Sequence, residues 1–389
     1  MDRRLAYLLI LQTLLLSTIL HAPWISPSLY TDIIGSYWRD FAESGRIPYL
    51  HKDSDGEPFE YPYLAAGISL LCSSFGGGLT GFYIAYSLVV MAFGILLAYC
   101  ALRLGEGWMV PLCLAAPSLV VYGIYGYDVI MAALTSLAIL LYTRGRYCLS
   151  AVVLALSAHV KLYSVLFLPY ALASLSGRER LRFLAAFALT YLAPVAALPS
   201  AFIDIIRFHS TWGLEVAWYV FLFPDAAHPV GRLIDAPPQL MASVRAAQVL
   251  GYAIFIILYL HVLTLRISPE RFMALSLMAY LMGTPRYSPQ TSILLLPFLP
   301  SIMGAHGAPF FILWEAANIS IVLTWFTTNV PHLPWQPPQT AALIRFLALL
   351  MMFLHAEARL GVIRLRIPKK VGKSISVFRE VIGRIVGGL

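Results

Sequence analysis

The sequence predicts an all-α polytopic membrane protein. Hydrophobic residues make up 60% of the 389 residues and charged residues only 12%, whereas a soluble globular chain is about half apolar and about a quarter charged. The mean hydropathy is +0.77, and apolar runs of roughly 15–22 residues recur along the whole chain. Backbone amides in lipid have no hydrogen-bond partner outside a helix, so these runs indicate membrane-spanning helices.

About twelve transmembrane helices are expected, and eleven to thirteen fit the pattern of apolar runs. Several runs are short and could be tilted pieces or half-spans. The segment 61–75 is apolar too, but we expect it to dip into the interface, because a crossing there would put the basic C-terminal tail outside. The expected spans are 5–23, 80–102, 108–125, 129–143, 147–160, 163–176, 182–200, 245–265, 271–284, 289–304, 308–327 and 340–356.

The first run, 5–23, could be a signal peptide or an uncleaved anchor. It follows two arginines, as the apolar part of a signal peptide does, but no small-x-small cleavage site follows it. The next residues, Pro-Trp-Ile-Ser-Pro, also fit a cleavage site poorly. An uncleaved anchor is the favoured interpretation.

Basic residues predict the orientation of the chain. Lys and Arg gather at the N-terminus, in short loops such as 176–182, and in the tail, and such clusters face the cytoplasm. The loops 24–62 and 201–244 are then extracytoplasmic. Residues 1–366 would form the transmembrane domain, and residues 367–389 a basic amphipathic tail on the cytoplasmic leaflet. The net charge of +8 thus reflects multi-pass insertion in the cell membrane, and no nucleic-acid partner is expected.

The first long loop carries a carboxylate, Asp32, just after the first span. Residues 32–45 predict an amphipathic helix that could lie in the interface and cover a cavity. Its apolar side would carry Ile33, Ile34, Tyr37, Trp38 and Phe41, and its polar side Arg39, Asp40 and Glu43.

Two interpretations of Asp32 are open from its position alone. Asp is favoured at the N-cap of a helix, where its side chain accepts a backbone hydrogen bond. A carboxylate in a cleft at the membrane surface could instead act as general base on a hydroxyl. Further along the loop, Asp53, Asp55 and Glu57 suggest a hydrophilic hairpin or a calcium loop, but the calcium pattern is truncated. No metal site is expected.

Lys161 and Arg286 lie between apolar runs on the expected outer side, against the positive-inside trend. A lysine at a span end can simply extend to the interface. Two cations converging on the outer face could also bind a phosphate or pyrophosphate group. Ionisable residues at this depth are costly, which makes them candidates for function.

Several short motifs, in order along the chain, resemble those of the GT-C superfamily of glycosyltransferases. They are "YTDI" with Asp32, "GRIPY", "EYPYL", "GYDVIMAAL" with Asp128, "HVKLYSVLFLP" with Lys161 and "RYSPQTSILLLPFLP" with Arg286. The resemblance is greatest to the polyprenyl-phosphate-mannose-dependent mannosyltransferases.

This resemblance implies an inverting transfer of a sugar, with mannose expected, from a polyprenyl-phosphate donor to a lipid or glycan hydroxyl. It implies Asp32 as general base, Lys161 and Arg286 as ligands of the donor phosphate, and Asp128 as a secondary site residue. No cofactor is implied, and no metal is needed. Further candidates for substrate binding are Tyr37, Glu60, His159, Ser288 and Gln290.

The main alternative is a transporter or flippase of lipid-linked sugars or other anionic substrates. A secondary transporter would show two related halves with broken spans. The sequence has no evident internal repeat, and a long acidic loop directly after the first span is unexpected for a transporter. An enzyme of the glycosyltransferase type is therefore the favoured hypothesis.

Overall fold

The computed structural model describes residues 3–26, 28–105, 107–210, 213–214, 216–226 and 238–362. The tail expected at 367–389 and, within the loop expected at 201–244, residues 211–212, 215 and 227–237 lie outside the described residues. The described chain is helical and contains no strand. The all-α expectation is therefore confirmed.

In the described part of the chain, six helices are long and apolar enough to cross a membrane. At about 1.5 Å per residue, a helix needs about 20 residues to cross a hydrocarbon core about 30 Å thick. All six coincide with expected spans, which confirms the membrane character of the chain. They are α1 (Arg3–His21), α3 (Gly78–Leu104), α9 (Gly177–Ala197), α11 (Pro238–Thr264), α14 (Ala308–Trp325) and α15 (Pro337–Arg359).

The outer surfaces of these long helices are apolar. Large aliphatic side chains are half or more exposed on them, as expected for surfaces that face lipid rather than water. Examples are Leu8, Leu88, Leu189, Ile257 and Leu323.

The other expected spans are short or broken. Three are continuous, namely α6 (Asp128–Thr143), α7 (Tyr147–Ala158) and α12 (Pro269–Gly283). Three expected as single helices are each divided into two pieces, because prolines remove amide donors and start new helices. The pieces are α4 (Met109–Leu114) with α5 (Pro117–Tyr122), η2 (Leu162–Phe167) with α8 (Leu168–Ser174), and η5 (Pro289–Leu294) with α13 (Leu299–Ile302). For these six segments the span count stays a prediction.

The first loop folds back on the bundle through two short helices. The expected amphipathic helix is present as η1 (Ile33–Ala42), wound in the wide π form, with Ile33, Tyr37 and Phe41 buried. Segment 61–75 contains α2 (Tyr63–Ser73), 11 residues long. That length corresponds to about 17 Å, roughly half of the hydrocarbon core, which fits a segment that dips without crossing.

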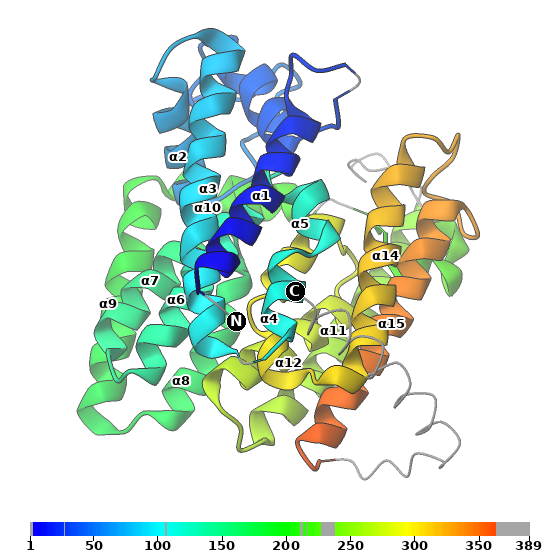
Figure 1. The fold of residues 1–389 in the computed structure, drawn as a ribbon. Coiled ribbons are helices and arrows are strands. Elements are labelled where there is room, and N and C mark those ends of the chain that lie inside the picture. Colours follow the sequence, from blue (N-terminus) through cyan, green and yellow to red (C-terminus); the bar gives the residue numbers. More distant parts are fainter. Residues whose placement is uncertain are drawn as a thin grey trace.

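Helix α6 lies at the centre of the bundle. Almost all of its residues are buried, and it packs against α3, α7, α12 and η5. Helices α14 and α15 pair as a hairpin on the other side of the molecule from α6 (Figure 1), where α14 packs against α5 and η5 and α15 against α12. The first loop, the start of α10 (Pro199–Ser210) and the turn between α14 and α15 lie toward the same end of the molecule, the upper end in Figure 1.

Candidate functional site

A cavity of about 890 Å³ brings together segments that are far apart in the sequence. Its walls come from the first loop, the start of η2, helices α10 and α11, the turn between α12 and η5, and the end of α14. Six of the nine predicted site residues line it, namely Asp32, Glu60, Lys161, Arg286, Ser288 and Gln290. The sequence thus identified residues that the fold does gather at one place.

Asp32 does not cap the helix that it precedes. Its backbone is already helical (φ −63°, ψ −34°) and its side chain makes no capping hydrogen bond. The hydroxyl oxygen of Thr31 does this instead, accepting the amide hydrogen bond of Ile34 at 3.1 Å. The Asp32 amide donates to the carbonyl oxygen of Tyr125 at 2.9 Å, which fixes the start of η1 against the turn before α6. The capping interpretation of Asp32 is therefore wrong.

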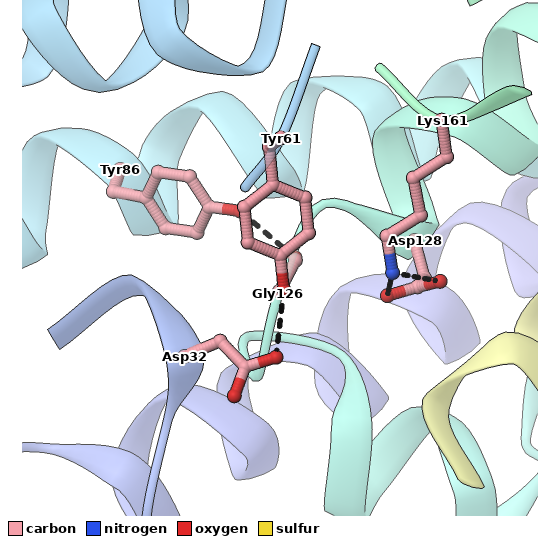
Figure 2. A network of polar contacts seen from close by, with 6 residues as sticks. All are labelled: Asp32, Tyr61, Tyr86, Gly126, Asp128 and Lys161. Carbon is pink, nitrogen blue, oxygen red and sulfur yellow. Dashed lines mark hydrogen bonds and ion pairs between the residues drawn. The ribbon is translucent and has the colours of Figure 1, made fainter. Parts of the chain in front are cut away.

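The Asp32 carboxylate lines the cavity, next to the neutral hydroxyl groups of Tyr61 and Tyr125. The hydroxyl of Tyr61 donates to Oδ2 at 2.8 Å (Figure 2). Burial raises the pKa of Asp32 to about 6, while the hydrogen bond from Tyr61 and the charge of Lys161 act in the opposite direction. A carboxylate with such a pKa is mostly charged at neutral pH and accepts a proton more readily than an ordinary aspartate, as a general base requires.

Lys161 is held by Asp128. The lysine has extended backbone (φ −155°, ψ 147°) between α7 and η2, and its ammonium group donates to both carboxylate oxygens of Asp128, at 2.9 and 2.8 Å. Asp128 is fully buried, whereas the Lys161 side chain is 12% exposed and lines the cavity. Asp128 begins α6, where the helix dipole favours a negative charge. Asp128 therefore orients the lysine from behind the cavity wall.

Tyr61 lies between the two carboxylate sites (Figure 2). Its hydroxyl bonds to Asp32, and the Lys161 ammonium lies 5.5 Å from the centre of its ring. Gly126 lies next to both carboxylates: a Cβ there would be in ordinary van der Waals contact with them, 3.4 Å from Asp128 Oδ2 and 3.9 Å from Asp32 Oδ2. The hydroxyl of Tyr86 donates to the Gly126 carbonyl at 2.8 Å. The sequence analysis did not assign a site role to Tyr61, Tyr86 or Gly126.

Arg286 lies in the irregular turn between α12 and η5, and contacts α10. Its guanidinium donates a hydrogen bond to the carbonyl oxygen of His209. The His209 ring in turn lies 3.1 Å from the carbonyl oxygen of Glu60. These contacts join α10, the first loop and the turn around the cavity. His209 is a further site residue that sequence reasoning missed.

Besides Asp128, two predicted site residues lie outside the cavity lining. Tyr37 packs against Phe59 and Phe82, and its hydroxyl lies 3.0 Å from the Ser73 hydroxyl. His159 stacks on Tyr191 with ring centres 4.8 Å apart. Both side chains are buried, so the structure places them in packing contacts next to the site.

The acidic hairpin in the first loop is organised by hydrogen bonds. Asp53 Oδ1 accepts the amides of Asp55 and Glu57, at 2.9 and 2.7 Å, the pattern by which Asp stabilises a turn. Within the described ranges, no three His, Cys, Asp or Glu side chains are grouped as metal ligands. A metal-free site stays a prediction.

No model of a known protein family matches this sequence, and no curated protein matches it either. The resemblance to GT-C glycosyltransferases therefore stays a prediction from the motifs.

The helix cap provides a test of this geometry. Thr31→Val keeps the buried shape but removes the capping oxygen, and should cost about 1 kcal/mol of stability. Asp32→Asn should leave the melting temperature unchanged or raise it, because the amide oxygen still accepts the Tyr61 hydroxyl and a charge disfavoured by burial is lost. Thermal unfolding of both variants in detergent measures this. Asparagine caps a helix about as well as aspartate, so Asp32→Ala is the variant that would remove a cap; a larger loss of stability in Asp32→Ala than in Thr31→Val, with Asp32→Asn unaffected, would restore the capping interpretation.

Proposed function

We propose that this chain is an inverting glycosyltransferase. It moves a sugar, with mannose expected, from a polyprenyl-phosphate donor to a hydroxyl of a lipid or glycan acceptor. One observation carries the proposal: a carboxylate with a raised pKa, Asp32, shares a single cavity with two cations, Lys161 and Arg286, in a helical membrane protein.

The chemistry needs little more than these three groups. The acceptor hydroxyl oxygen attacks C1 of the sugar from the side opposite the phosphate and gives its proton to the Asp32 carboxylate. The bond between C1 and the phosphate oxygen breaks, its electron pair stays on that oxygen, and the configuration at C1 inverts. Lys161 and Arg286 stabilise the negative charge that gathers on the departing polyprenyl phosphate. Positioning and one proton transfer account for the catalysis.

The remaining walls suit the rest of the donor. Ile205, Ile206 and Tyr252 from α10 and α11 give an apolar side beside the cations, which fits a polyprenyl chain. Hydrogen-bonding groups are available for sugar hydroxyls from Glu60, Ser288 and Gln290, and flat aromatic surfaces from Tyr30, Tyr125 and Trp325.

The proposal includes the GT-C-like membrane arrangement. About twelve spans would carry the site on the extracytoplasmic face of the cell membrane, with the C-terminus in the cytoplasm. A lipid-phosphate donor fits this side of the membrane, because its leaving group is already activated and no nucleotide has to be present.

The direct test is a transfer assay. Membranes containing the protein are incubated with radiolabelled polyprenyl-phosphate mannose and then with the glucose analogue, and lipid and glycan products are separated. Asp32→Asn should lower transfer by about 10²–10⁴-fold, the usual contribution of a general base. The matched control is Asp40→Asn, a carboxylate on the same helix that does not line the cavity.

Loss of transfer in Asp32→Asn but not in Asp40→Asn, with both proteins folded, is the expected outcome. Full transfer activity in Asp32→Asn would show that Asp32 is not the general base. If the wild type instead moves the donor across the membrane and forms no glycosidic product, the protein is a transporter of lipid-linked sugars.

The cations make a separate prediction about the donor. Arg286→Ala should raise the KM for the donor about tenfold or more and leave the acceptor KM nearly unchanged, since it removes a charged hydrogen-bond donor from a phosphate. Lys161→Ala alone leaves the buried Asp128 charge unpaired and should reduce the amount of folded protein. The double variant Lys161→Met, Asp128→Asn removes both charges together, and should fold while using the donor poorly.

Arg39→Ala is the control for loss of a cation, because Arg39 is exposed on the outer side of η1. Donor kinetics equal to the wild type in both Arg286→Ala and the folded double variant would show that these cations have structural roles only.

A further inference from the structure

A charged side chain away from the cavity, that of Arg345 on α15, is completely buried between helices. Its guanidinium donates to Asn318 Oδ1 on α14 at 2.8 Å, to the Val216 carbonyl at 2.9 Å and to the Tyr287 carbonyl at 2.6 Å. It also stacks on the ring of Tyr287, 3.5 Å from the ring centre. Arg345 does not line the cavity.

These contacts satisfy a stretch of irregular backbone. The turn 284–290 runs from the end of α12 into the first residues of η5. Carbonyl groups of such irregular backbone are tolerated at membrane depth only where protein satisfies them. Arg345 binds the carbonyl of Tyr287, and Asn318 Nδ2 donates to the carbonyl of Pro289 at 3.1 Å. The Thr284 hydroxyl donates to the carbonyl of Arg286 at 2.7 Å.

The clamped turn is the one that carries cavity residues. Tyr287 is buried, with its ring on Arg345 and its hydroxyl 3.1 Å from Ser292. Its neighbours in the chain, Arg286 and Ser288, line the cavity. Where Tyr287 is anchored therefore decides which way the side chains on either side of it point.

We infer that Arg345, together with Asn318, is a positioning residue that fixes the turn 284–290 so that Arg286 and Ser288 face the cavity. Arg345 acts on the bound anion only through Arg286. The inference rests on the proposed function only for the nature of that anion, a polyprenyl phosphate. The cost of burying a charge among membrane helices is offset by the order it gives to the site.

The same helix supplies a matched control. Arg359, near the other end of α15, also donates to a backbone carbonyl, that of Ile302, at 3.0 Å. Arg359 is distant in sequence from the turn and does not line the cavity. Arg345→Met and Arg359→Met each remove from α15 one arginine that donates to a backbone carbonyl. A general effect of destabilising α15 would therefore appear in both variants.

Hydrogen–deuterium exchange on the purified protein tests the positioning directly. In Arg345→Met, amides of residues 284–291 should exchange about tenfold faster or more, because charged hydrogen bonds that hold the turn are lost. In Arg359→Met these amides should exchange as in the wild type. Asn318→Leu should loosen the same peptide and provides the test if Arg345→Met does not fold. Unchanged exchange of 284–291 in the folded variants would overturn the inference.

Binding of farnesyl phosphate, followed by tryptophan fluorescence (Trp325 lines the cavity), links the turn to the anion. Arg345→Met and Arg286→Ala should each weaken binding about tenfold, and the double variant should bind no more weakly than Arg286→Ala, because both act through one group. Additive losses would overturn the inference. If Arg286→Ala leaves binding unchanged, the proposed function fails at the phosphate, whereas the exchange result still decides whether Arg345 positions the turn.

Discussion

The structure depends on the different hydrogen bonds that two neighbouring carboxylates, Asp128 and Asp32, make inside a helical bundle. Asp128 and Asp32 lie on either side of Gly126, close enough that one Cβ there would contact both. Asp128 receives both hydrogen bonds from Lys161, whereas Asp32 receives the Tyr61 hydroxyl. The first carboxylate is thereby fixed as the structural partner of Lys161. The second keeps a pKa raised by burial, and this difference is why the proposed function gives the proton-accepting role to Asp32.

The same arrangement explains why the cavity has a second cation. The charge of Lys161 is balanced by Asp128 behind it, so the anionic leaving group of the proposed reaction would need further positive charge on its other side. Arg286 supplies this charge from a turn that is itself irregular. A turn of this kind keeps its shape only while its carbonyl groups are satisfied, which Arg345 and Asn318 do from α15 and α14. The buried polar groups of the hairpin α14–α15 are thus connected to the cavity through the turn that carries Arg286.

Sequence reasoning was most successful where a residue type is costly. Asp32, Lys161 and Arg286 were found because charges are rare in so apolar a chain, and each does line the cavity. Tyrosine gives no such signal: the chain contains 22, and nothing in the pattern separates Tyr61, which bonds to Asp32, from Tyr37, which packs in the core. The position of Asp32 alone left capping open, because the sequence does not show that Thr31, directly before it, makes the capping hydrogen bond. Helix breaks at prolines were underestimated because apolar runs continue through them.

The most direct test of the account is the pH dependence of kcat/KM for the acceptor. With Asp32 as the base, the rate should be constant above its pKa of about 6 and fall as the pH drops through that value, because the protonated carboxyl cannot accept another proton. Tyr61→Phe removes a hydrogen bond that stabilises the charged form, so the inflection should move to higher pH. A profile that stays flat down to about pH 5, or an inflection that Tyr61→Phe leaves in place, would contradict the account.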